Sequence, residues 1–123
     1  MEFEDLTSKV IGCAVEVHRQ LGPGMLESAY EQCLAHEFVL NRIIFKRQIS
    51  LPVHYKGVQL DCGYRLDFLV EDKLIIELKA VEAILPIHKA QLLSYLKISE
   101  LSVGLLINFN VALLKDGITR MVL

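Results

Sequence analysis

Long apolar runs, a basic charge excess and paired cysteines are all missing from this sequence of 123 residues. No apolar stretch approaches the roughly 18 residues that a membrane-crossing helix needs, so we expect no transmembrane segment. The first ten residues, "MEFEDLTSKV", are acidic and differ from a secretory signal, in which a basic segment precedes an apolar one. These absences predict a cytoplasmic protein.

Cysteine is scarce and odd in number. Cys13, Cys33 and Cys62 are widely spaced and form no CxxC pair, so they predict buried free thiols instead of a zinc site or a disulfide framework. The net charge of −2 argues against a protein that coats nucleic acid by electrostatics alone. The chain also has neither GxxxxGK[ST] nor a strand-preceded GxGxxG, which excludes the common nucleotide-binding loops.

Apolar residues are abundant and set the size of the core. They make up 53% of the chain, with a mean hydropathy of +0.40, at the upper end for a soluble globular protein. A chain of 123 residues supports one core of ordinary size, so we treat residues 1–123 as a single domain. The apolar excess also suggests an exposed apolar patch, which is a natural interface for a homodimer.

Helical periodicity dominates the first third of the chain. Residues 5–21 carry apolar side chains at spacings of three and four, namely Leu6, Val10, Cys13 or Ala14, Val17 and Leu21. Gly22, Pro23 and Gly24 end this helix, because glycine accepts a left-handed conformation and proline cannot continue the hydrogen-bond ladder. A second helix is predicted over residues 25–41, with an apolar face of Leu26, Tyr30, Leu34 and Phe38.

Short apolar runs replace the helical period from residue 43 onward. The runs "IIFKRQISL", "PVHYKG", "VQLDCGYRLDFLV" and "KLIIELKAV" predict three or four antiparallel strands. Tight turns are expected at Lys56-Gly57 and around Glu71-Asp72. This part of the chain therefore predicts a β-meander.

A third helix and further strands complete the predicted order. Pro86 begins the helix, whose inward side chains are expected to be Ala90, Leu93 and either Leu96 or the stem of Lys97. The nearly all-apolar run "VGLLINFN" predicts a central strand, and a final hairpin is expected around Asp116-Gly117. The order is thus two helices, a β-meander, a helix and more strands.

Three charged residues stand inside the apolar runs of "YRLDFLVEDKLIIELKA". Because side chains alternate along a strand, Glu77 and Lys79 lie on one face of theirs. A two-residue loop before position 73 would pair Asp67 with Ile76 and separate the carboxylates, whereas a three-residue loop would pair Asp67 directly with Glu77. The length of this turn therefore decides whether the two carboxylates meet.

Opposed carboxylates inside a sheet are destabilising unless a cation lies between them. Carboxylate oxygens are hard ligands that suit Mg²⁺ or Mn²⁺, and Lys79 would lie beside the same site. That combination suits hydrolysis of a phosphodiester. The spacing alone equally admits a simpler interpretation, in which Asp67, Glu77 and Lys79 lie on the solvent-exposed face of a sheet.

The sequence then shows a family resemblance. Asp67 followed by "ELK" at residues 77–79 resembles the core signature of the PD-(D/E)XK nuclease superfamily, and "GMLESAY" at residues 24–30 is similar to the GxxExxY motif of a small bacterial family within it. The segments "GYRLDFLV", "IELKAVE", "PIHKAQLLSYL" and "GLLINFN" with "LLKDGITR" resemble that family's other blocks in order. The resemblance implies a restriction-endonuclease-like α/β fold with a mixed sheet and an α-β-β-β-α-β core. Leu66 departs from the signature, which has proline there.

The resemblance also implies roles for individual residues. Asp67 and Glu77, with the backbone carbonyl of Leu78, would hold Mg²⁺, for which Mn²⁺ can substitute. Lys79 would position and activate the nucleophile. Glu27 would hold a second metal or a metal-bound water. From the residues alone, Glu27 is interpreted as an acid favoured by the dipole at a helix start.

Residues on the predicted helices support this site. Gln91 matches a helical glutamine of several superfamily branches and would steer a ligand or a phosphate oxygen, with Tyr95 one turn later on the same face. An ordinary polar helix face explains the same pair. Tyr30 is interpreted as a core aromatic that supports Glu27.

Other polar residues carry weaker signals. His18, His36 and His54 have no partner at metal spacing and are expected on the surface or satisfied in the core, while His88 could reach a phosphate or simply begin its helix. A small phosphate-contacting rim, or merely solvated charge, is expected from Arg42, Lys46 and Arg47 together with Lys56, Arg65 and Lys89.

Two functions remain after the sequence is read. The first is a metal-dependent phosphodiesterase, a DNA endonuclease or a nuclease for a particular nucleic-acid structure, with Asp67, Glu77 and Lys79 at its centre. The second is a catalytically silent module of the same fold that binds nucleic acid, a nucleotide or a protein partner. The first is favoured because every catalytic position holds the required residue type.

Overall fold

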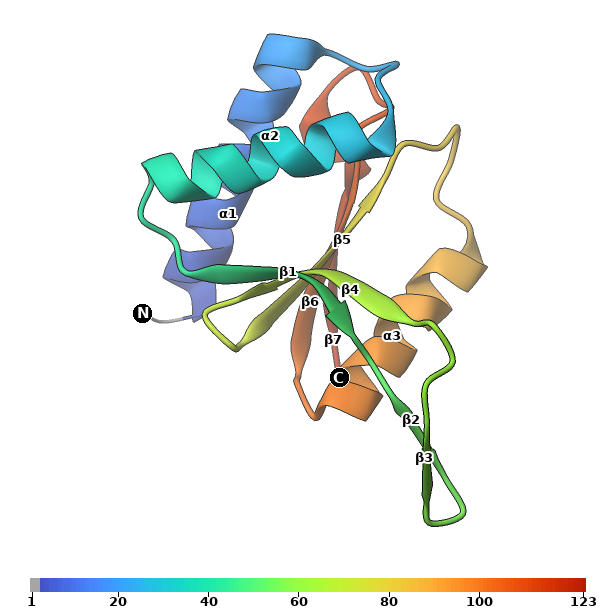
Figure 1. The fold of residues 1–123 in the computed structure, drawn as a ribbon. Coiled ribbons are helices and arrows are strands. Elements are labelled where there is room, and N and C mark those ends of the chain that lie inside the picture. The colour runs from blue at the N-terminus through green and yellow to red at the C-terminus, as the bar shows by residue number, and fades with distance from the viewer. Residues whose placement is uncertain (1–2) are drawn as a thin grey trace.

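A five-stranded mixed sheet lies between two layers of helices (Figure 1). The computed structural model describes residues 3–123. Helices α1 (Phe3–Leu21) and α2 (Glu27–Leu40) cover one face of the sheet, and α3 (Pro86–Ser99) covers the other. The α/β class and the mixed sheet flanked by helices agree with the sequence prediction.

The strands are arranged in the order β1-β4-β5-β6-β7. Strands β1 (Phe45–Ser50), β4 (Arg65–Val70) and β5 (Leu74–Lys79) are antiparallel neighbours. Strand β6 (Val103–Asn108) runs parallel to β5, and α3 supplies the crossover that a parallel pair requires. Strand β6 is buried along its whole length, as the apolar run "VGLLINFN" predicts.

A separate hairpin interrupts the predicted meander. Strands β2 (Val53–Tyr55) and β3 (Val58–Leu60) pair only with each other and extend away from the main sheet (Figure 1). Their turn lies at Lys56-Gly57, as predicted. The prediction of one continuous meander is wrong, because β4 pairs with β1 across the hairpin instead of with β3.

The two faces of the sheet form two apolar clusters. On the α1/α2 side, Tyr30, Leu34 and Phe38 are buried as predicted, whereas Leu26 is 77% exposed because it precedes the first residue of α2. The predicted helix over residues 25–41 therefore began two residues too early. Among the inward residues predicted for α1, Leu6, Val10, Cys13, Ala14 and Val17 are buried.

The inward face of α3 agrees with the prediction at Leu96 and in part at Leu93, and differs from it at Ala90. Leu92, Tyr95 and Leu96 are the buried residues of this helix, while Ala90 is exposed and Leu93 is half-buried. The ring of Tyr95 packs between α3 and the sheet, because a tyrosine ring is largely apolar. Tyr95 therefore takes the inward position that the sequence pattern gave to Ala90.

The carboxyl-terminal hairpin is formed by other strands than those predicted. A 3₁₀ turn covers Leu114–Gly117, and β7 (Ile118–Val122) pairs back onto β6. Leu114 is buried in the core, which draws this segment out of an extended conformation. A Cβ added at Gly117 would lie 2.1 Å from the carbonyl oxygen of Asn108, so the approach of these two segments requires glycine.

The cysteines are free thiols, with different exposures. Cys13 is buried, Cys33 is half-buried and Cys62 is exposed, so the prediction of burial is wrong for Cys62, which lies in the loop between β3 and β4. Within residues 3–123, no helix is long and apolar enough to cross a membrane.

Candidate active site

The turn between β4 and β5 has the length that brings the carboxylates together. Residues 71–73 form the turn, and the pairs Val70 with Leu74 and Phe68 with Ile76 set the register. Continued by one residue, this register places Asp67 opposite Glu77. The three-residue loop that the sequence left as one of two possibilities is the one observed.

At this point in the sheet, the two carboxylates accept hydrogen bonds from backbone N–H groups in place of the usual backbone carbonyls. The backbone N–H of Asp67 donates to Oε1 of Glu77 at 3.1 Å, and the backbone N–H of Leu78 donates to Oδ2 of Asp67 at 2.8 Å. The regular pairing of β4 with β5 ends at Phe68 and Ile76. Each strand therefore holds the acidic side chain of the other, which fixes both carboxyl groups face to face.

Burial and mutual repulsion disfavour two negative charges here. Glu77 is only 5% exposed, and its burial, followed by the nearby charge of Asp67, raises its pKa to about 9. Burial also raises the pKa of Asp67, against the lowering effect of its hydrogen bond from Leu78. Without a cation, the pair therefore retains a proton at neutral pH, on the Glu77 side.

Lys79 and Glu27 lie close enough to this pair for their charges to interact with it. Burial and the charge of Asp67 raise the pKa of the Glu27 carboxyl, while the ammonium of Lys79 lowers it. The same ammonium favours the charged forms of Asp67 and Glu77. Lys79 is half-buried at the end of β5, and Glu27 begins α2, so two separate elements deliver a cation and an acid to the carboxylate pair.

Tyr30 fixes the start of α2 and thereby the position of Glu27. Its hydroxyl donates to the carbonyl of Gly22 at 2.6 Å and accepts the N–H of Met25 at 3.1 Å. Its ring stacks on Phe109, with centroids 4.4 Å apart. The turn before α2 needs left-handed backbone at Gly22, where φ is 69°. Tyr30 is thus a core aromatic, as expected, and its hydroxyl anchors this turn.

Two further residues at the site were missed by the sequence interpretation. Glu31 lies one helical turn after Glu27 and accepts hydrogen bonds from Gln48 and from Arg47, the latter at 2.8 Å. Gln48 also places its amide nitrogen 3.4 Å from Oδ1 of Asp67. The spacing of Glu27 and Glu31 by four was a usable signal. No signal marked Gln48, which bends β1 with a φ of 51° that glycine usually supplies.

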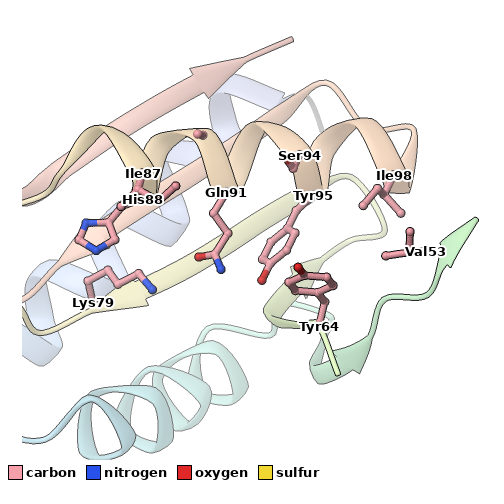
Figure 2. A pocket seen from close by; sticks show the side chains of 10 residues that line it. Val53, Tyr64, Lys79, Ile87, His88, Gln91, Ser94, Tyr95 and Ile98 are labelled. Carbon is pink, nitrogen blue, oxygen red and sulfur yellow. The ribbon is translucent and has the colours of Figure 1, made fainter. Parts of the chain in front are cut away.

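Helix α3 presents Gln91 and Tyr95 toward the same region. Both residues line a pocket that also contains Lys79 and His88 (Figure 2). Burial raises the pKa of the Tyr95 hydroxyl, and the nearby Glu77 adds to this effect. His88 accepts the N–H of Leu85 on Nδ1 at 2.9 Å, so it caps the start of α3, one of its two predicted roles, while its ring borders the pocket.

The remaining predicted polar residues have separate surroundings. His18 is buried and its Nε2 lies 2.8 Å from the carbonyl oxygen of Val111, as expected of a satisfied core histidine, and His36 and His54 are exposed. The basic residues lie on several elements: Lys46 pairs with Asp72 at 3.2 Å, Arg47 with Glu31, and Lys56 lies over the Tyr55 ring at the hairpin tip, while Arg42, Arg65 and Lys89 are exposed.

The donor set fits a hard divalent cation bound with few protein ligands. Among residues 3–123, no group of three or more histidine, cysteine, aspartate or glutamate side chains is arranged to hold a metal ion. Asp67 and Glu77 nonetheless offer two facing carboxylates whose shared proton a cation would replace. Mg²⁺ is commonly held by one or two carboxylates, with water and substrate phosphate completing its octahedron.

The fold and this site together define the class of restriction-endonuclease-like domains. A mixed sheet is flanked by helices, and an acidic pair and a lysine lie on β4 and β5. A family model described as the PD-(D/E)XK nuclease superfamily matches residues 4–121, and the chain belongs to this superfamily. Comparison with curated proteins and with solved structures gives no match. Membership indicates a nuclease-type function.

Proposed function

We propose that this protein is a metal-dependent nuclease that hydrolyses phosphodiester bonds of DNA, and that it belongs to the GxxExxY group of its superfamily. The observation that carries the proposal is the buried, face-to-face pair of Asp67 and Glu77 with Lys79 beside it. A sheet gains nothing in stability from opposed buried carboxylates unless a cation joins them.

Asp67 and Glu77 would hold Mg²⁺, or Mn²⁺ in its place, with the carbonyl of Leu78 as a further oxygen donor. Bound there, the ion supplies Lewis acidity toward a phosphate and a water. Lys79 donates hydrogen bonds to a phosphate oxygen or to the attacking water and stabilises the negative charge that develops. Glu27, whose carboxyl is within range of the charges of Asp67 and Lys79, would hold a second metal or a metal-bound water, and Glu31 with Gln48 holds Asp67 in place.

Helix α3 would orient the substrate. The Gln91 amide can donate to a phosphate oxygen, and the Tyr95 hydroxyl lies close enough to Glu77 for that carboxylate to affect its pKa. Arg65 is exposed at the first residue of β4, next to the site, where it can contact a neighbouring phosphate of the same strand.

Cleavage assays test this function. Plasmid, single-stranded DNA, branched DNA and RNA are each incubated with the protein in Mg²⁺, in Mn²⁺ and in EDTA. We expect metal-dependent cleavage of at least one DNA substrate, and we expect Glu77→Ala to abolish it because half of the carboxylate pair is lost. The exposed glutamate Glu82 supplies the matched control, and Glu82→Ala should cleave like the wild type.

Two results would overturn the proposal. Cleavage that persists in Glu77→Ala would come from another site or from a contaminant. Absence of cleavage on all four substrates in either metal would favour the catalytically silent binding module.

A further inference from the structure

A pocket of about 570 Å³ opens beside Lys79 on the α3 side of the sheet (Figure 2). Its walls come from α3, from Tyr64 just before β4 and from Val53 at the start of the hairpin. This volume is typical of sites for small organic groups. The pocket is therefore large enough for a ligand and lies next to the proposed catalytic centre.

The walls of the pocket are apolar and aromatic. Val53, Ile87 and Ile98 line it, and Ile87 remains 67% exposed because no other part of the core covers it. Tyr64 and Tyr95 stand edge to face, with ring centroids 6.0 Å apart. Tyr95 is fixed by burial, whereas Tyr64 is 43% exposed, so one ring of the pair is accessible for stacking.

Polar groups converge on the same space without partners of their own. Within residues 3–123, neither the Gln91 amide nor the Ser94 hydroxyl is engaged in a hydrogen bond with the protein. Figure 2 shows the Gln91 amide and the Lys79 ammonium pointing toward one another. Flat apolar walls with a few unengaged donors and acceptors suit a flat ring that has polar edges.

Lys79 connects the pocket to the carboxylates. It lines the pocket, and it follows Glu77 by two residues on the same face of β5, so its side chain lies between the pocket and the carboxylate pair. A phosphate held by Lys79 would thus have its neighbouring nucleoside at the pocket mouth.

We propose that this pocket takes one unpaired nucleobase of the strand being cut, the base that flanks the phosphate at Lys79. A paired base cannot enter, because its polar edge and both of its faces are occupied within the duplex. An unpaired base can stack on Tyr64 and use Gln91 and Ser94 for its edge. The inference rests on the proposed function and names its substrate as single-stranded or locally unpaired nucleic acid.

Binding of short oligonucleotides, measured without turnover, tests this pocket. All proteins carry Glu77→Gln, which blocks the proposed cleavage by removing one of the two carboxyl groups. Fluorescence anisotropy gives the dissociation constants of a labelled single strand, in DNA and in RNA form, and of the matching duplex. We expect the single strand to bind at least fivefold more tightly than the duplex, and the DNA and RNA arms show which sugar is accepted.

Ser94→Trp fills the pocket from an exposed helical position and should weaken single-strand binding about 5- to 150-fold, the range for loss of one stacked base. Ser8→Trp is the matched control, because Ser8 is an exposed serine on α1 across the sheet, and it should bind within twofold of the parent. Tyr64→Ala should also weaken single-strand binding, whereas Tyr64→Phe should bind like the parent because it keeps the aromatic ring.

The outcomes separate this inference from the proposed function. Unchanged single-strand binding by Ser94→Trp and Tyr64→Ala would overturn the proposal that the pocket binds a base. Equal affinity for single strand and duplex would overturn it as well. Pocket-dependent binding by a protein that cleaves nothing would overturn hydrolysis and leave the pocket intact.

Discussion

Replacing Lys79 with alanine should reduce the turnover number for DNA cleavage about 10²- to 10³-fold, the usual effect of removing one preorganised donor from a developing negative charge. Lys79 is half-buried beside the carboxylate pair, so its charge acts in a less polar medium than water. Steady-state kinetics on the best substrate of the cleavage assay measure this effect. The Michaelis constant should change much less than the turnover number.

Two variants make the result specific to the position of the charge. Lys97→Ala removes an exposed lysine from the last turn of α3 and should retain the turnover number within about twofold. Lys79→Arg should restore little activity, because the planar guanidinium differs from a compact ammonium in reach and shape. Full activity in Lys79→Ala would remove this residue from the mechanism.

Glu77→Gln should make the metal-free protein more stable than the wild type at neutral and alkaline pH. The amide fills the same space, can accept the N–H of Asp67 as Oε1 does now, and removes the free-energy cost of keeping Glu77 protonated above its unfolded pKa. Each unit by which folding raises a pKa corresponds to about 1.4 kcal/mol. A gain of a few kcal/mol is expected near pH 8, measured by urea unfolding in EDTA. Asp67→Asn should act in the same direction.

The pH dependence has a definite sign. The folded pKa of Glu77 is raised from 4.5 to about 9, so between these values the folded state binds more protons than the unfolded state. The free energy of unfolding of the wild type should therefore be highest near pH 5 and fall as the pH rises toward 9. Asp67, Glu27 and Lys79 lie around the Glu77 carboxyl. Because the pKa values of Asp67 and Glu27 are also raised, both acids add to this decrease in stability with rising pH.

Controls identify the source of the slope. Glu77→Gln should be much less dependent on pH in this window, while Glu82→Gln, at an exposed loop position, should behave like the wild type. Added Mg²⁺ should raise wild-type stability most at high pH, because a cation stabilises the fully charged pair. A wild-type stability that stays constant or increases from pH 5 to pH 9 would contradict the proposed electrostatics.

Strand periodicity predicted correctly which side chains of β5 share a face. Alternation along β5 places Glu77 and Lys79 on the face opposite Ile76 and Leu78, and the structure agrees: Ile76 and Leu78 lie in the α1/α2 cluster. The meeting of Asp67 with Glu77 depended on one loop length. Periodicity cannot supply that length, because Glu71 and Asp72 both adopt a φ of 54° without glycine. The register therefore had to come from the structure.

Contacts between distant segments were less predictable. Gln48 contacts Asp67 and Glu31 only because its own backbone is left-handed and bends β1. The sequence "KRQIS" contains no glycine or other signal that predicts this bend. The error over Ala90 has a simpler cause. Tyrosine was counted as polar, yet Tyr95 is 5% exposed and packs its ring under α3. A tyrosine with an apolar body belongs to either pattern, so only packing decides its face.

Binding of Mn²⁺ tests most directly whether Asp67 and Glu77 form a metal site. Titration calorimetry of the wild type at pH 8 should show binding accompanied by proton release, because the cation displaces the proton that the pair shares. Asp67→Asn and Glu77→Gln should each weaken the affinity at least tenfold, and Glu82→Gln should leave it unchanged. Wild-type affinity in either site variant, or no detectable binding by the wild type, would contradict the account.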